Sequence, residues 1–218
     1  MSRWGFFITF EGVEGCGKST LAWKLYDYLK SEGFSVVFTR EPGGPPVAED
    51  IRDVLLRPDR KPEPWTEVFL LLAARHENVK KVIYPALTNS SIVISDRYDD
   101  STFAYQCYGR GLPYKIVSRF NKFATMRIKP NLTFLIDLPV EKGLERIGVG
   151  NLDRMEQETI DFHRRVREGY LKLARRAKKR FYVLDGLKTP EELFEQVKQV
   201  TIERLKQKGP IGRFKGKA

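Results

Sequence analysis

The sequence contains only two cysteines, Cys16 and Cys107, among its 218 residues. Two cysteines cannot build a disulfide framework, and no Cys/His spacing typical of a zinc site occurs, so we expect two free thiols. Long apolar runs are also missing. The longest, residues 6–10 and 69–74, fall well short of the roughly 20 residues that span a bilayer, which predicts no transmembrane helix. The N-terminus lacks the apolar core of a signal peptide, and we therefore expect a cytoplasmic protein.

The composition is that of a basic globular protein. With 41% hydrophobic and 12% aromatic residues the chain can bury a sizeable core, which excludes disordered and collagen-like proteins. Lys and Arg number 39 against 28 Asp and Glu, a formal net charge of +11. This charge predicts an anionic partner, and nucleic acid, a membrane surface and phosphorylated small molecules all satisfy it.

Short apolar segments alternate with longer segments of helical period, a pattern typical of a parallel sheet covered by helices. We predict an α/β protein with five parallel strands over residues 6–10, 34–39, 91–95, 133–137 and 181–184. Their apolar runs are continuous, which indicates burial on both faces. The predicted helices cover residues 18–32, 47–56, 65–87, 140–147, 157–179 and 190–207, with two further pieces within 99–126. We expect one domain over 1–208 and a flexible basic tail over 209–218.

The segment that follows the first predicted strand satisfies the pattern G-x-x-x-x-G-K-[ST] in full, with Gly12, Gly17, Lys18 and Ser19 at the fixed positions. Glycines let backbone N–H groups surround a phosphate, the lysine neutralises the β- and γ-phosphates, and the serine hydroxyl is placed to ligate Mg²⁺. A glycine-rich turn can match by chance, but here the motif lies between a predicted strand and a predicted helix, as a phosphate loop requires. We therefore expect ATP to bind Gly12, Val13, Glu14, Gly15, Cys16, Gly17, Lys18, Ser19 and Thr20.

Asp96 and Arg97 directly follow the third predicted strand. Ligands of open α/β sheets bind beyond the carboxyl ends of the strands. Asp96 is suited to hold Mg²⁺, and Arg97 to bind a phosphate with two N–H groups. An exposed ion pair at the edge of a loop explains the same two residues equally well.

Two further arginines stand out. Arg75 shares a helical stripe with Val68, Leu72 and Val79, and an arginine on an inward face needs a polar partner or a ligand. A side chain that reaches past the apolar stripe to solvent is the alternative. Arg40 opens the loop 39–46, whose prolines and glycines by themselves indicate an ordinary tight turn.

The segment 157–180 is rich in Arg and Lys and is a candidate for nucleic-acid contact. A solvated helix face is the commoner explanation of such a segment. Its aromatic residues, Phe162 and Tyr170, are spaced to join the core rather than to stack on bases.

Taken in order, these segments resemble the thymidylate kinases, which transfer a phosphoryl group from ATP to dTMP with Mg²⁺. The landmarks lie in residues 10–20, 39–44, 49–52, 72–75, 95–98, 101, 104–106, 109–111 and 153–156. The resemblance spans nearly the whole chain and implies a P-loop kinase fold with a lid over about 146–156. It also implies ATP and dTMP as small-molecule substrates and a homodimer.

The resemblance assigns roles in acceptor binding. It implies that Glu14 meets the 3′-hydroxyl of dTMP, that Arg40 and Arg97 hold its phosphate and that Arg75 hydrogen-bonds the thymine. By the same resemblance Tyr105 crowds the 2′ position of the sugar, Gln106 lies near the base and Leu55 forms part of an apolar wall. Leu71 stands where the family places a phenylalanine that stacks on the base, which weakens base discrimination or transfers it to a neighbour.

Phosphoryl transfer to a phosphate needs no strong general base, because the second pKa of the acceptor is about 6 and it is largely ionised at neutral pH. It needs cations that cancel the repulsion between two anions, and we expect Lys18, Mg²⁺, Arg40 and Arg97 to supply them. Some members of the family add an arginine in the phosphate loop, where this chain has Gly15. The remaining candidates are Arg146 and Arg154, at the two ends of the predicted lid.

Two alternatives stay open at this point. A kinase of the same fold could act on dUMP or on a deoxynucleoside such as thymidine, whose hydroxyl would need Glu14 or Glu41 as a base. A nucleic-acid-binding P-loop ATPase would use the net charge of +11 instead. The acceptor-site motifs favour the kinase of thymidylate.

Overall fold

The structure is a computed structural model that describes residues 4–148, 150 and 152–209. Its centre is a sheet of five parallel strands in the order β2-β3-β1-β4-β5. The strands are β1 (Phe6–Gly12), β2 (Val36–Arg40), β3 (Ile92–Asp96), β4 (Leu132–Asp137) and β5 (Phe181–Asp185). The α/β class, the five strands and their parallel direction are confirmed.

The prediction that all five strands are buried on both faces is wrong for the two edge strands. All seven residues of β1 are buried, as are the first four of β3 and the first five of β4. In β2 and β5 buried residues mix with half-exposed and exposed ones, and Val183 is 47% exposed. An edge strand has a sheet neighbour on one side only, so the flanking helices cover it less completely.

The helix predicted over 65–87 consists of three consecutive parts: α3 (Pro64–Asn78), the π-helical turn η1 (Val79–Ile83) and α4 (Tyr84–Thr88). Helical backbone angles at the junctions, Val79 and Tyr84, make the segment continuous. Pro85 has no N–H to donate to the helix ladder, and the π-helical turn lies directly before the turn that contains it.

The other helices agree with their predictions within a few residues. They are α1 (Lys18–Ser31), α2 (Pro46–Leu56), α5 (Asp99–Thr102), the π-helix η2 (Phe103–Gly109), α6 (Tyr114–Ala124), α7 (Val140–Ile147), α8 (Ile160–Arg176) and α9 (Pro190–Lys208). Helix α8 begins later than expected because the Thr159 hydroxyl caps it by accepting a hydrogen bond from Phe162 N. The tail predicted over 209–218 lies, apart from Gly209, outside the described residues.

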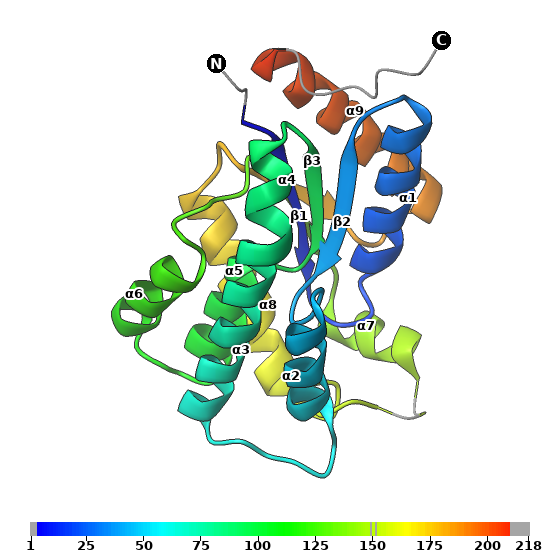
Figure 1. Cartoon of the computed structure of the whole chain (residues 1–218). Coiled ribbons are helices and arrows are strands. Elements are labelled where there is room, and N and C mark those ends of the chain that lie inside the picture. The colour runs from blue at the N-terminus through cyan, green and yellow to red at the C-terminus, as the bar shows by residue number, and fades with distance from the viewer. Residues whose placement is uncertain (1–3, 149, 151, 210–218) are drawn as a thin grey trace.

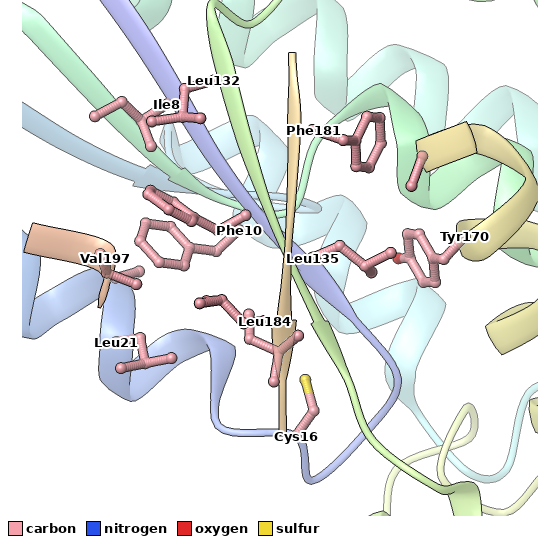
Figure 2. Close-up of a cluster of buried hydrophobic side chains, with 14 of the residues drawn as sticks. Ile8, Phe10, Cys16, Leu21, Leu132, Leu135, Tyr170, Phe181, Leu184 and Val197 are labelled. Carbon is pink, nitrogen blue, oxygen red and sulfur yellow. The ribbon is translucent and has the colours of Figure 1, made fainter. Parts of the chain in front are cut away.

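Helices cover both faces of the sheet, with α1 and α9 on one side and the continuous α3–η1–α4 segment on the other (Figure 1). Figure 2 shows the same division among core side chains: Phe10 and Leu184 face Leu21 and Val197, whereas Leu135 faces the side of Tyr170. Tyr170 belongs to α8 and is 1% exposed, so the expectation that the aromatic residues of this basic helix join the core is confirmed.

The parallel direction brings the carboxyl ends of the strands to one edge of the sheet. The phosphate loop leaves β1 there, and the register places Asp96 of β3 between Phe10 of β1 and Arg40 of β2. Three segments far apart in the sequence thus meet at this edge. No helix within the described part of the chain is long and apolar enough to cross a membrane, and both cysteines are free thiols.

Candidate active site

The phosphate loop needs its glycines for two different reasons. Gly12, Gly15 and Gly17 have φ angles of 151°, 68° and 87°, which disfavour residues with a side chain. At Gly15 a Cβ atom would lie 2.0 Å from the carbonyl oxygen of Gly143 in α7, so space is lacking as well. A side chain at position 15 would require α7 to move. An arginine at position 15 would therefore clash with α7 in this structure.

One cavity of about 650 Å³ opens beside the phosphate loop. Most of the predicted site residues line it: Glu14, Gly15, Gly17, Lys18, Ser19, Thr20, Arg40, Leu55, Leu71, Arg75, Asp96, Arg97, Tyr105, Gln106 and Arg154. Gly12, Val13, Cys16 and Arg146 do not line it. The fold therefore joins the predicted phosphate site and the predicted acceptor site in a single space.

Arg97 connects the two parts of this cavity. Its Nη2 donates to both carboxylate oxygens of Glu14 at 2.8 Å, and its Nη1 donates to the carbonyl oxygen of Gly12 at 3.0 Å. Burial alone would raise the pKa of Glu14, but Arg97 and Lys18 outweigh it and hold that pKa well below its usual range. The Tyr105 hydroxyl donates to the same carboxylate at 2.7 Å. The proposed alternative of an exposed pair between Asp96 and Arg97 is wrong, because Arg97 pairs with Glu14.

The cation end of the site holds Lys18, Ser19 and Asp96. Lys18 Nζ lies 3.4 Å from Glu14 Oε2, and Ser19 Oγ donates to Asp96 Oδ2 at 2.5 Å. The other oxygen, Asp96 Oδ1, is buried without a hydrogen-bond partner among the described residues. A hydroxyl beside a carboxylate with a free oxygen fits a hard cation such as Mg²⁺. Within the same residues no cluster of three or more His, Cys, Asp or Glu could hold a metal ion.

Arg40 is held at the mouth of the cavity, where its side chain is 50% exposed. Its Nε and Nη2 donate to the two carboxylate oxygens of Glu49 at 3.1 and 2.7 Å. Glu49 Oε1 also accepts a hydrogen bond from Gly44 N, which fixes the loop 41–45. The sequence indicates an ordinary turn here. In the structure the loop binds Glu49 through Gly44 N, and Glu49 in turn holds the Arg40 guanidinium beside the cavity.

Arg75 is 2% exposed, so the alternative that it reaches to solvent is wrong. Its Nε donates to Glu41 Oε2 at 2.6 Å, Nη1 donates to Thr102 and Asn121, and Nη2 donates to the carbonyl oxygen of Tyr98 at 3.0 Å. A guanidinium has five N–H groups. Four of them have partners among the described residues. The fifth, on Nη2, has no partner among these residues, and Arg75 lines the cavity.

Glu67 connects the far end of the cavity to the predicted lid. It is 1% exposed and accepts hydrogen bonds from Gln106 Nε2 at 2.8 Å and from Arg110 at 2.7 and 3.0 Å. Arg154 Nη1 lies 2.7 Å from the same carboxylate, and Arg154 Nε donates to the carbonyl oxygen of Leu55. Burial would raise the pKa of Glu67, but Arg110 and Arg154 lower it.

The two candidate lid cations are placed differently. Arg154 is 6% exposed and lines the cavity. Arg146, at the end of α7, donates to the carbonyl oxygen of Gly186 at 3.3 Å and lies outside the lining. Residues 149 and 151 of the predicted lid lie outside the described part of the chain.

Three basic residues of helix α8 form ion pairs on its outer side. Arg164 pairs with Glu141 and Asp161, Arg167 pairs with Asp137, and Lys172 pairs with Glu168. These charges are compensated within the protein. These three pairs agree with the commoner explanation of this basic segment, a solvated helix face.

Comparison with known proteins agrees with this geometry. The profile of the family described as thymidylate kinase matches residues 10–197, which include both the phosphate loop and the acceptor side of the cavity. The chain belongs to the thymidylate kinase family. It is therefore an ATP-dependent nucleoside monophosphate kinase, a phosphotransferase.

Individual members of the thymidylate kinase family are similar over most of their length. The thymidylate kinase of Sulfurihydrogenibium sp. is 47% identical over 208 residues, 95% of this chain and 100% of the relative. That of Carboxydothermus hydrogenoformans is 49% identical over 195 residues, 89% and 95% of the two chains. The crystal structure of thymidylate kinase from Ehrlichia chaffeensis superimposes with a TM-score of 0.74 at 32% identity and covers 90% of this chain and 98% of that one.

Sequence reasoning assigned no site role to several residues that hold the thymidylate kinase site together, although Glu11 and Ser101 lie in the landmarks. These side chains are Glu11, Glu67, Ser101, Thr102, Asn121 and Tyr170. Glu11 precedes the first glycine of the phosphate loop and Ser101 follows Arg97 by four residues, so their positions carried a signal. Asn121 and Tyr170 reach the site only through the packing of α6 and α8, and nothing in their local sequence indicates it.

Proposed function

We propose that this protein transfers the γ-phosphoryl group of ATP to dTMP, giving dTDP and ADP. The observation that carries the proposal is the cavity that Lys18, Arg75 and Gln106 line together. A donor phosphate on the loop and an acceptor base beside Arg75 then bring the reacting groups together near Arg97. Family membership supports the same acceptor.

Charge neutralisation is the main task in this transfer, because donor and acceptor are both anions. Lys18 reaches the donor phosphates, and Arg97 and Arg40 hold the acceptor phosphate in line with them. Mg²⁺ would neutralise phosphate charge when bound, and Ser19 and Asp96 are the side chains that would hold it. The acceptor phosphate is ionised at neutral pH, so we assign no general base.

Thymine recognition follows from the count of hydrogen-bond groups. Arg75 keeps one N–H for a ligand, since its other four have partners in the protein. A single N–H matches the O4 carbonyl of thymine and opposes the amino group that cytosine carries there. Gln106 gives one amide hydrogen to Glu67, which leaves its carbonyl oxygen for the N3–H of the base.

The sugar of dTMP would lie between Tyr105 and Glu14. The Tyr105 hydroxyl is fixed by Glu14 Oε1 at 2.7 Å and by Arg97 Nη2 at 3.0 Å. A phenol fixed at this place would crowd a 2′-hydroxyl, which favours deoxyribose. The Glu14 carboxylate, kept ionised by Arg97 and Lys18, is the acceptor for the 3′-hydroxyl.

Arg154 is our choice for the lid cation that acts on the transferred group. Arg154 lines the cavity and pairs with Glu67. Glu67 also accepts a hydrogen bond from Gln106, the residue that we assign to the base. Arg146 stays the second candidate, for a lid position in which it leaves Gly186.

A homodimer belongs to the same proposal. Helices α3 and α6 present an aromatic patch of Phe69, Phe120 and Phe123, which are 53%, 43% and 80% exposed. The rings of Phe69 and Phe120 meet edge to face with centroids 5.7 Å apart. Exposed aromatic side chains in one patch are typical of an interface, and a second copy of the chain offers an identical surface. A cytoplasmic location suits the two free thiols.

The test is an assay of ADP release with ATP and Mg²⁺ over dTMP, dUMP, dAMP, dCMP and thymidine. We expect a clear preference for dTMP, with dUMP second because it offers the same O4 and N3–H. Preference for another monophosphate would overturn the assignment of the base pocket while leaving the transfer chemistry intact. Turnover with none of the five would overturn the proposal as a whole.

A further inference from the structure

Among the described residues, five carboxylate side chains are buried: Glu11, Glu41, Glu67, Asp99 and Asp100. Four of them have a cation in contact. Glu41 pairs with Arg75, Glu67 with Arg110 and Arg154, Asp99 with Lys129, and Asp100 with Arg180. Among the residues that the structure describes, no Lys, Arg or His nitrogen lies within 4.0 Å of the carboxylate of Glu11, which is 0% exposed. A buried carboxylate without a cation is costly when it is ionised.

Two cations that act on Glu11 electrostatically, Arg97 and Arg180, are already engaged. Arg97 donates its Nη2 to both oxygens of Glu14, and Arg180 donates to both oxygens of Asp100 at 2.6 and 2.9 Å. Neither guanidinium is free to turn toward Glu11. The like charge of Asp100 disfavours a second anion beside it.

The contacts of Glu11 are neutral groups. Its Oε1 accepts a hydrogen bond from Tyr98 N at 2.8 Å. Its Oε2 lies 2.7 Å from Ser101 Oγ and 3.0 Å from the Tyr170 hydroxyl, and these two hydroxyls lie 2.8 Å apart. Oε2 and the two hydroxyl oxygens thus form a triangle in which every edge has hydrogen-bond length.

Counting protons decides the charge of this triangle. Each edge needs one hydrogen, and the two hydroxyls supply two. If Glu11 is ionised, one edge has no hydrogen and two lone pairs face each other. If Glu11 carries a proton on Oε2, three hydrogens serve three edges in a ring. Each hydroxyl oxygen then donates once, accepts once and keeps a lone pair for Arg97 Nη1, which lies 3.3 Å from Ser101 and 3.0 Å from Tyr170.

We propose that Glu11 is a neutral carboxylic acid at pH 7 and acts as a positioning residue for Arg97. Two routes carry this effect. Through the ring, Glu11 turns hydroxyl lone pairs toward the guanidinium. Through Tyr98 N, it holds the backbone next to Arg97, whose φ of 70° is unfavourable for a residue with a side chain.

The charge of Glu11 matters for the reaction because Arg97 already shares its charge with Glu14. A second carboxylate behind Arg97 would reduce the positive potential that it offers to an acceptor phosphate. The effect of Glu11 on the reaction rests on the role proposed above for Arg97, whereas the protonation state of Glu11 does not. Burial and the charge of Asp100 raise the pKa of Glu11 to about 8, in agreement with the proton count.

Infrared difference spectroscopy of the intact protein at pH 7 tests the protonation state. The C=O stretching band of a protonated carboxylic acid is absent from ionised carboxylates, and we expect Glu11→Gln to remove one such band. Tyr170→Phe deletes two edges of the ring and should shift that band without removing it, which gives a second test that leaves Glu11 in place. A spectrum without any protonated-acid band that these changes remove or shift would overturn the proposal, whatever substrate the enzyme uses.

Steady-state kinetics test the positioning role. We expect Glu11→Ala to raise the KM of the acceptor about 10-fold with the KM of ATP unchanged, through loss of the hydrogen bonds around Arg97. Glu11→Gln, which has the shape of the neutral acid, should recover most of that loss. Glu168→Gln, an exposed carboxylate on α8, is the matched control. A Gln variant as impaired as the Ala variant, or one that does not fold, would overturn the neutral-acid assignment.

Discussion

Arg97 Nη2 lies 2.8 Å from each carboxylate oxygen of Glu14, so the residue that ends strand β3 is tied to the middle of the phosphate loop. The pair joins the part of the site that faces the donor to the part that faces the acceptor. Glu14 therefore has a defined charge and direction before any nucleotide binds, and Arg97 cannot swing out of the cavity. Such preorganisation reduces the cost of arranging two anions for reaction.

Lys18→Ala should abolish phosphoryl transfer. The ammonium stabilises charge that develops on the transferred group, and alanine leaves that charge uncompensated. The measurement is kcat at saturating ATP and dTMP, with Lys172→Ala on the outer face of α8 as the control. Turnover of Lys18→Ala within a few-fold of the unchanged protein would contradict this role.

Arg75→Ala should weaken dTMP binding and leave the affinity for ATP unchanged, because Arg75 lies at the base end of the cavity. It should also destabilise the fold by about 3–5 kcal/mol, since Glu41 loses its buried partner. Isothermal titration with each nucleotide separates the two ligands. The double variant Arg75→Met, Glu41→Gln removes both charges and should regain stability without regaining dTMP binding. Equal losses for ATP and dTMP would count against base recognition.

Leu71→Phe should tighten dTMP binding. Leu71 lines the cavity, and an aromatic ring there can stack on thymine for about 0.5–1.5 kcal/mol, a 2- to 10-fold fall in KM. Val183→Phe, at a 47% exposed position of the edge strand β5, is a control of similar size change. An unchanged or raised KM in Leu71→Phe would show that another group already fills the stacking position.

The stability of the protein should carry a pH-dependent contribution from Glu11. Because the pKa of Glu11 rises from 4.5 to about 8 on folding, the folded state binds the extra proton between these values. The contribution is complete below about pH 4.5 and is lost as pH rises through about 8. Denaturant unfolding gives the free energy of unfolding of the unchanged protein and of Glu11→Gln. The first value minus the second should decrease over this pH range, by at most about 1.4 kcal/mol per pH unit. A difference that stays constant between pH 4.5 and 8 would mean that Glu11 is already ionised in the folded protein.

Phe123→Asp should convert the protein to a monomer. Phe123 is 80% exposed and stacks on His76 with ring centroids 6.0 Å apart, so its replacement disturbs the aromatic patch without opening the core. Sedimentation velocity distinguishes the two states. Val183→Asp, on an exposed position away from the patch, is the control. A monomeric unchanged protein would contradict the proposed dimer. A Phe123→Asp variant that stays dimeric would place the interface elsewhere.

Local sequence was sufficient for most of the fold. Continuous apolar runs marked β1, β3 and β4, because strands in the middle of a parallel sheet are apolar on both faces. The same rule failed for β2 and β5, since position within the sheet is not encoded in the strand itself. The π-helical turn at 79–83 was also missed, because periodicity does not separate it from an α-helix of the same residues.

The sequence by itself determined the phosphate loop, since Gly12, Gly17, Lys18 and Ser19 act through backbone geometry that a short segment fixes alone. It also placed Asp96 and Arg97 at the carboxyl end of a strand. Only the tertiary structure decided the partners of these groups: Glu14 for Arg97, Glu41 for Arg75, and the hydroxyls of Ser101 and Tyr170 for Glu11. The reason is that a buried charge is defined by what packs against it, and here those groups come from strands and helices up to 159 residues apart in the chain.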